Sequence, residues 1–285
     1  MTSSKTPVTI PPKSMLDGLI DYTAPGNKWA PQWNIVDTQY NRLGEFMRPS
    51  IDVVRRVFNV CAHLTRAYDP THDLGHHTQV FKNGMEICQR LMLKNRMRVI
   101  TFVIYSTLTH DIIDKKYPEN LAEKDAALTQ FFFNDLGCDA VNAKWIVSHM
   151  SFGKENEAKR KEGKLHGTNE RTAWISHDDP DVQLARDISS DADKLEALGE
   201  IGIERTYGVG RMFNEKKIAG MKKEEANAFI ENVVIEHAHE KLLLLKDDYI
   251  YTSAGKELAE AGHKHIADHV KMLEEKKRQS LVNRL

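Results

Sequence analysis

The residue types best suited to chemistry are His110 and Asp111, adjacent at the end of an apolar stretch, Val99 to Leu108. His76 lies upstream of this pair and Asp193 lies downstream. A carboxylate presented from a buried helix is costly unless a cation compensates its charge. Two imidazoles and two carboxylates are enough to hold a divalent metal, which can activate water near neutral pH. The set therefore points toward hydrolysis, while the His-Asp pair alone also fits a packed core histidine.

Two further His-Asp dipeptides differ from this one in their surroundings. His177-Asp178 lies in a polar stretch next to Pro180, which is typical of a solvated turn. His72, of His72-Asp73, lies four residues before His76, so both would project from one face of a helix. This spacing suits two metal ligands, or one ligand and one acid-base or outer group.

The composition limits the classes of function. With 285 residues, 41% hydrophobic and 28% charged, the chain can bury a large core and is neither membrane-like nor disordered. A net charge of -1 provides no global attraction to nucleic acid or anionic lipid. Three cysteines without CxxC spacing argue against a zinc ribbon and a disulfide framework. We expect a cytoplasmic protein, with a nuclear location left open, that binds a small-molecule nucleotide or phosphate ester and neither nucleic acid nor membrane, and a homodimer is left open.

Apolar residues recur at helical spacing along most of the chain, and strand signals are scarce. We therefore expect an all-α fold, a helical bundle formed by one domain over residues 41–285. Prolines and glycines predict an irregular N-terminal arm over residues 1–40. A polar insertion spans residues 153–181 and is either a lid that shapes substrate choice or an exposed segment without a catalytic part. The expected helices cover residues 41–47, 51–68, a segment capped by Asp69 or Thr71 that runs to Leu93, 97–113, 121–136, 141–150, 182–202, 222–245 and 253–277.

The ordered set His76, His110-Asp111 and Asp193 resembles the H…HD…D signature of the HD-domain metal-dependent phosphohydrolases, which are all-helical proteins. More specifically, the chain resembles the small bacterial HD hydrolases typified by YpgQ and YedJ. The matching segments begin at about Arg55 and extend over most of the remaining chain: THDLGHHTQVF, THDIID, VSHMSF, SDADKLEALGEIGIERTYGVG and HAHEKLLLLKDDYIYTSAGKELAEAG.

This resemblance implies that the metal ligands are His76, His110, Asp111 and Asp193. It further implies that His72 acts as an acid or contacts phosphate, and that Asp114, three residues after Asp111, orients the attacking water. His149 would bind phosphate or a second metal, its alternative being a packed histidine at a helix end. The expected substrate-binding residues are Lys115, His149, Lys194 and Arg205, because phosphoryl transfer needs positive charge around the phosphate oxygens.

Imidazole and carboxylate ligands without thiolate suit Mn, Fe, Co, Ni or Zn, with Mg less well matched to histidine, and we favour Mn. The sequence contains neither a P-loop nor a Rossmann glycine fingerprint, so metal and basic residues would hold the phosphates of a nucleotide. The resemblance implies a phosphohydrolase that cleaves a phosphoester or phosphoanhydride bond, plausibly a (d)NTP pyrophosphohydrolase. Two alternatives stay open: a di-iron oxygenase in which His72 and His149 are further ligands, and a non-catalytic nucleotide-binding protein.

Overall fold

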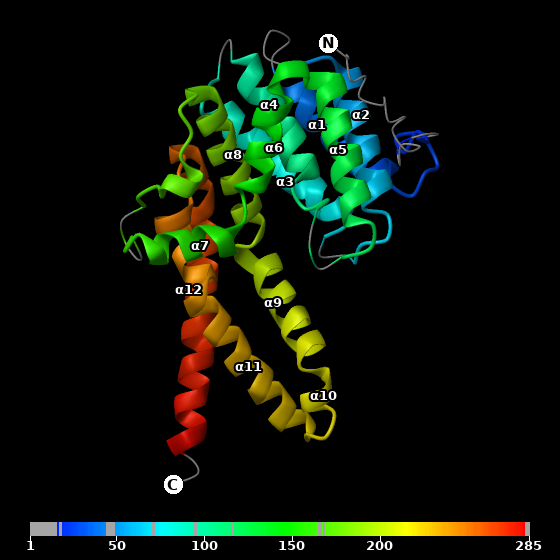
Figure 1. Cartoon of the computed structure of the whole chain (residues 1–285). Coiled ribbons are helices and arrows are strands. Elements are labelled where there is room, and N and C mark those ends of the chain that lie inside the picture. The colour runs from blue at the N-terminus through cyan, green and yellow to red at the C-terminus, as the bar shows by residue number, and fades with distance from the viewer. Residues whose placement is uncertain are drawn as a thin grey trace, which may run out of the picture.

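The structure is a computed structural model, which describes residues 16, 19–43, 49–69, 72–93, 96–113, 115, 117–164, 167 and 169–282. Helices are the only regular secondary structure in these residues, which confirms the expected all-α fold (Figure 1). The α-helices are α1 (Ala30–Arg42), α2 (Ile51–Leu64), α3 (Leu74–Arg90), α4 (Met97–Thr109), α5 (Leu121–Leu136), α6 (Ala140–Ser148), α7 (Phe152–Lys161), α8 (Pro180–Glu196), α9 (Gly199–Phe213), α10 (Glu215–Ile218), α11 (Lys223–Glu240) and α12 (Ser253–Val282).

Three helices, α3, α4 and α8, pack on one another at the centre of the bundle. The near-continuous apolar sequence of α4 matches its burial, because the residues Val99 to Thr109 are buried apart from Thr101. Hydrophobic side chains of α1, α2, α5 and α6 complete the same core. The bundle therefore rests on the three helices that also carry the predicted metal ligands.

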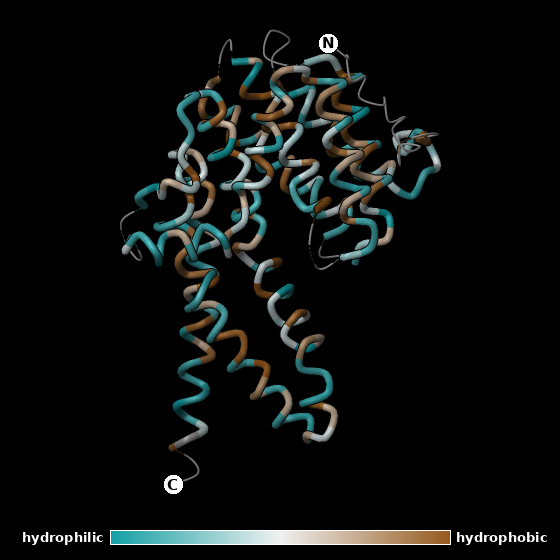
Figure 2. The backbone as a smooth tube through the Cα atoms, viewed as in Figure 1, coloured by the Kyte–Doolittle hydropathy of each residue, from teal (hydrophilic) through white to brown (hydrophobic). Residues whose placement is uncertain are grey.

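The C-terminal helices extend away from this bundle. In Figure 1, α9, α11 and the second half of α12 project together, with α10 at their far end. Figure 2 shows hydrophobic and hydrophilic residues interspersed along these projecting helices. Within this projecting part, Ile230, Val234 and Leu273 form a small buried hydrophobic core, and Tyr207 and Phe229 pack against it. In the described part of the chain, no helix is both long and apolar enough to cross a membrane.

The cap of α3 is Asp73, not Asp69 or Thr71 as the sequence suggested. Its Oδ1 accepts hydrogen bonds from the N–H of Gly75 at 2.7 Å and of His76 at 3.4 Å, which satisfies two free donors of the first turn. Thr71 lies outside the described residues. The His72-Asp73 dipeptide therefore uses its carboxylate to start the helix that presents His76.

The expected helix over residues 182–202 is wrong at its C-terminal end, where the chain forms two helices. Gly199 has φ +81°, a conformation that favours glycine and interrupts the helix after Glu196. A Cβ on Gly202 would lie 2.0 Å from the carbonyl oxygen of Ala197, so the turn packs tightly on the start of α9. The interruption lets α9 leave the bundle instead of continuing the direction of α8.

Two further expectations, both about the N-terminal region, are wrong. The arm over residues 1–40 is not irregular throughout, because α1 begins at Ala30 with Pro31 in its first turn, where a missing N–H costs nothing. The expected helix over residues 41–47 is the end of α1 at Arg42, and residues 44–48 lie outside the described ones. The segment 153–181, expected as a polar insertion, contains most of α7, a short 3-10 helix at Ala173–Ile175 and the start of α8.

Candidate metal centre

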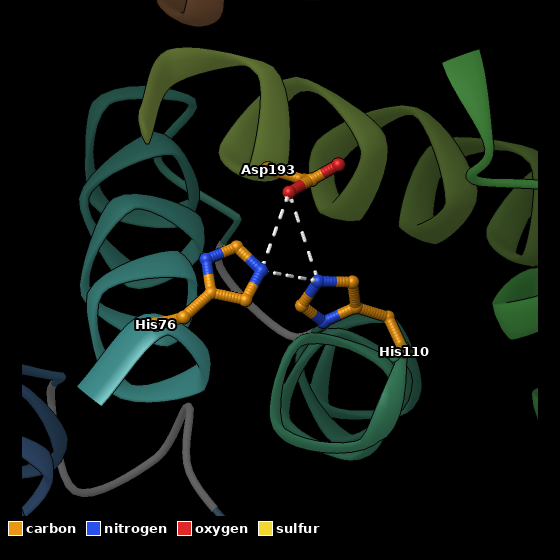
Figure 3. Close-up of side chains that lie close together, drawn as sticks. All are labelled: His76, His110 and Asp193. Carbon is orange, nitrogen blue, oxygen red and sulfur yellow. Dashed lines mark hydrogen bonds and ion pairs between the residues drawn. The ribbon is translucent and has the colours of Figure 1, made fainter. Parts of the chain in front are cut away.

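Two imidazole nitrogens and a carboxylate oxygen converge between α3, α4 and α8. Nε2 of His76 lies 3.0 Å from Nε2 of His110, and Oδ1 of Asp193 lies 3.7 Å from the first nitrogen and 3.6 Å from the second (Figure 3). Oδ2 of Asp111 lies 3.4 Å from Nε2 of His76 and 3.6 Å from Nε2 of His110. The structure thus brings together all four residues predicted as metal ligands.

These separations fit a divalent cation. Ligand bonds of about 2.0–2.2 Å place neighbouring donor atoms about 3 Å apart or somewhat more. The ligand atoms of His76, His110 and Asp193 all lie within 4.8 Å of one another, and both histidines are buried. Two neutral imidazoles and a carboxylate match the first-row divalent metals. The Nε2 atoms of His76 and His110 face each other at hydrogen-bond distance, and a metal ion would give both of them a partner.

Each ligand is placed by a local feature of its helix. His76 lies in the first turn of α3 after the Asp73 cap, and His110 directly follows the last residue of α4. Asp193 lies near the end of α8, whereas Asp191 on the same helix points elsewhere and accepts backbone hydrogen bonds from Tyr251 at 2.9 Å and Thr252 at 2.7 Å. The acidic patch of α8 therefore divides into a candidate metal ligand, Asp193, and a residue that accepts backbone hydrogen bonds, Asp191.

Both histidines have groups that orient their rings. Nδ1 of His110 lies 3.0 Å from the carbonyl oxygen of Thr107, which can only accept, so Nδ1 carries the proton and Nε2 presents its lone pair. Nδ1 of His76 lies 3.1 Å from Oε2 of Glu196, although the two groups are not aligned for a hydrogen bond. Such outer contacts fix the tautomer of a metal-binding imidazole.

The imidazoles also set the charge state of the carboxylates. Burial raises the pKa of Asp111, but His110, His76 and His77 outweigh it and hold the pKa well below its ordinary value. Burial likewise raises the pKa of Asp193, and His110 and His76 lower it further than burial raises it. Both carboxylates are therefore ionised across the neutral range, as metal ligands must be.

Glu196 is a residue that the motif search missed. Its carboxylate is mostly buried and approaches His76 on one side and pairs with Arg205 on the other. In the sequence it appears as one more acid of the patch around Asp193, and the available signal was its position three residues, about one helical turn, after Asp193. It contacts a ligand and is therefore a positioning residue.

We expect Glu196→Ala to lower the affinity for Mn²⁺ by about 10–100-fold, because His76 loses the carboxylate that lies 3.1 Å from its Nδ1. Calorimetric titration of the metal-free protein with Mn²⁺ measures this change. Glu196→Gln keeps an acceptor oxygen and should retain most of the affinity. The matched control is Glu200→Ala, an exposed acid in the first turn of α9; equal affinities for the Glu196 and Glu200 alanine variants would show that the contact is idle.

His72 lies beside the centre and has its own polar partners. Its Nδ1 lies 3.3 Å from the hydroxyl of Tyr117 and 3.8 Å from Oδ1 of Asp69, and the Tyr117 hydroxyl also bonds to Asp69. The ring centroids of His72 and His76 are 6.1 Å apart. His72 is therefore held at the edge of the cavity, while its expected role as an acid stays a prediction.

His149 is not brought to the centre. Its ring stacks on Trp145 at 4.3 Å and lies 4.7 Å from the Trp174 ring, and its Nδ1 lies 2.7 Å from the Trp145 carbonyl oxygen. Burial is the largest cause that lowers its pKa. The packed helix-end histidine that the sequence left open describes this placement, which does not fit the further iron ligand of the oxygenase alternative.

A cavity of about 960 Å³ opens directly onto the centre and is lined by His72 and all four predicted ligands. Three of the basic residues expected to bind substrate also line it. Lys115 is exposed, Arg205 pairs with Glu196, and Lys194 is buried with its Nζ 3.2 Å from Oε2 of Glu155. Asp114, the expected water-orienting residue, lies outside the described residues.

Solved structures with a similar fold cover most of the chain. A Lactobacillus plantarum protein matches with a TM-score of 0.54 and 16% identity over 81% of this chain and 99% of that one. A selenomethionine form of Bacillus subtilis YpgQ matches with a TM-score of 0.50 and 23% identity over 79% and 96%. The crystal structure of Bacillus subtilis YpgQ in complex with ADP matches with a TM-score of 0.49 and 21% identity over 79% of this chain and 95% of that one. At these identities the likeness concerns the fold alone.

The sequence comparison is more specific. No family model matches the chain. The chain is 31% identical over 171 residues to YpgQ of Bacillus subtilis (strain 168), a protein described as uncharacterized, and the match covers 59% of this chain and 69% of YpgQ. The chain belongs to the YpgQ family.

Proposed function

We propose that this chain is an HD-type metal-dependent phosphohydrolase that acts on a nucleotide, plausibly as a (d)NTP pyrophosphohydrolase, with residues 41–285 as its catalytic domain. The observation that carries the proposal is the convergence of the Nε2 atoms of His76 and His110 with Oδ1 of Asp193 beside Asp111. A bound divalent cation, for which we favour Mn²⁺, would supply Lewis acidity and make water a nucleophile near neutral pH. His76, His110, Asp111 and Asp193 would hold it.

The surroundings of the centre support a phosphorylated substrate. Arg205 and Lys115 line the cavity and provide positive charge that a phosphate chain needs, and Lys194 adds a third cation at its wall. His72 lies at the cavity edge with its Nδ1 near a hydroxyl and a carboxylate, and it would give a proton to a leaving oxygen. Asp114 would orient the attacking water.

The nucleotide part of the proposal rests on family and on size. The relative YpgQ, which is linked to this chain by sequence, has been crystallised in complex with ADP. A cavity of about 960 Å³ is large for a phosphate alone and lies within the range of sites for small organic ligands, about 300–1,000 Å³. The chemistry and the space together favour a nucleoside phosphate over inorganic phosphate.

Incubation of the protein with a panel of nucleoside triphosphates in Mn²⁺, Mg²⁺, Co²⁺ or Ni²⁺, followed by product identification, tests the proposal. We expect metal-dependent release of pyrophosphate and a nucleoside monophosphate, with the highest rate in Mn²⁺. Unchanged turnover by metal-free protein would contradict the metal-dependent mechanism. Tight nucleotide binding with no product after long incubation would instead favour the non-catalytic nucleotide-binding protein.

A further inference from the structure

One face of α9 lines the cavity over the whole length of the helix. The residues that line it recur every three or four positions, which places them on one side of a helix: Gly202, Arg205, Thr206, Val209, Gly210 and Phe213. In Figure 1, α9 runs from the end of α8, next to the metal centre, away from the bundle. The cavity therefore extends from the metal centre along α9.

The chemical character of this face changes along its length. Arg205 lies at the end near the metal centre, where it pairs with Glu196. Val209 and Phe213 are one and two turns farther on, and the rise of 1.5 Å per residue puts Phe213 about 16 Å along the helix from Gly202. The cavity thus offers a cation near the metal and an apolar surface at a distance.

Other elements also contribute apolar side chains to the lining of the cavity. Leu128 and Phe132 of α5 and Val147 of α6 line the same cavity as Val209 and Phe213. Polar side chains are interspersed with them, among them Thr129, and the cavity-lining His237 has a pKa lowered mainly by burial. Apolar walls with a few polar groups are typical of sites for a planar heteroaromatic ring, which needs apolar faces and polar edges.

We propose that the Val209–Phe213 end of α9 binds the base of the nucleotide, with Phe213 contacting the ring. This inference rests on the proposed function and extends it from the phosphates to the group that they carry. Phe213 is 72% exposed in the structure. An exposed phenylalanine is unremarkable by itself; the continuity of its surface with the metal-binding cavity is what assigns it a ligand.

ADP and inorganic pyrophosphate both contain a diphosphate, but ADP also carries a base. A comparison of their affinities therefore distinguishes base binding from phosphate binding. Calorimetric titration with ADP and with inorganic pyrophosphate, both with saturating Mn²⁺, compares the wild type with Phe213→Ser and Met212→Ser. Met212 is the neighbouring residue, is 60% exposed and does not line the cavity, so it is the matched control. We expect Phe213→Ser to weaken ADP binding by about fivefold to a hundredfold, the range for loss of one base–aromatic stack, and to leave pyrophosphate binding unchanged. Met212→Ser should leave both affinities unchanged.

Equal weakening of ADP and pyrophosphate by Phe213→Ser would overturn the assignment, because the effect would then reach the phosphate site. Unchanged ADP affinity would overturn it as well. A shift in size-exclusion elution of both serine variants would assign this apolar surface to a second copy of the chain. If the wild type bound neither ligand, the proposed function would be contradicted. This outcome is seen without any variant, so it can be distinguished from a failure of the base-binding assignment.

Discussion

Asp193→Asn is expected to abolish metal binding and to reduce nucleotide turnover by at least about a hundredfold. The substitution replaces a carboxylate that lies 3.6–3.7 Å from the Nε2 atoms of His110 and His76 with a neutral amide. A bound metal contributes several kcal/mol to transition-state stabilisation, and each 1.36 kcal/mol corresponds to a factor of ten in rate. After this substitution, Asp111 is the one remaining carboxylate among the four proposed ligands.

Binding and turnover can be measured separately. Thermal unfolding with and without Mn²⁺ reports metal binding, because a ligand that binds only the folded state raises the midpoint, and by more as its concentration exceeds the Kd. We expect the midpoint to rise for the wild type and to stay constant for Asp193→Asn. The control is Asp181→Asn, the same change in the first turn of the same helix, where the carboxylate pairs with Arg96 and does not line the cavity. A metal-dependent rise in Asp193→Asn equal to that of the control would remove Asp193 from the ligand set.

The sequence predicts the bundle well where helical periodicity and burial agree. Residues 121–136 were expected as a helix and form α5 with the same bounds, and the uniformly apolar segment from Met97 becomes the buried α4. Agreement is poorer where glycine or proline decides the path. Pro31 starts a helix instead of preventing one, and Gly199 ends a helix whose apolar pattern continues beyond it. The apolar periodicity of a sequence indicates which face of a helix is buried, but it does not indicate where the helix ends and the chain changes direction.

The cluster of candidate ligands was also predictable, for a reason that differs from periodicity. A buried His-Asp pair needs compensation and only His110-Asp111 has an apolar helix before it, while the resemblance to HD-domain proteins implied its partners His76 and Asp193. Glu196 and the α9 wall could not be found in this way. Glu196 approaches His76 from the last turn of α8, one helical turn after Asp193, and the direction of α9 along the cavity depends on the turn at Ala197–Gly199. Lys194 lines the cavity and also contacts the buried carboxylate of Glu155, a partner that its sequence position did not indicate.

That carboxylate, Glu155, carries the largest expected effect on stability. It lies in α7, within the segment expected from sequence as a polar insertion, and is fully buried. Its Oε2 accepts hydrogen bonds from Arg186 at 2.8 Å and Lys194 at 3.2 Å, and its Oε1 accepts one from the Tyr251 hydroxyl at 2.6 Å. Removal of one partner of a buried ion pair costs about 3–5 kcal/mol, since the remaining charges stay buried without compensation. We expect this loss of unfolding free energy for Glu155→Gln.

The pH dependence of stability gives a second measure of the same group. Burial raises the pKa of Glu155, but Lys194, Arg186 and the Tyr251 hydroxyl lower it by more, so the folded pKa lies below the ordinary value. A carboxyl with a lowered folded pKa stabilises the fold above its unfolded pKa, and this contribution is lost as the pH falls through the folded pKa. The stability of the wild type should therefore fall more steeply with acidification than that of Glu155→Gln.

Denaturant unfolding followed by circular dichroism measures both effects. The matched control is Glu157→Gln, the same substitution two residues along the same helix, where an exposed carboxylate pairs with Lys161 and little change is expected. Equal stability losses for the two variants would mean that the buried contacts of Glu155 add nothing beyond a surface pair. A larger loss for Glu155→Gln, with a flatter response to acid, would make α7 part of the folded core through its contact with α8. The segment 153–181 would then be a structural support beside Lys194 and the cavity.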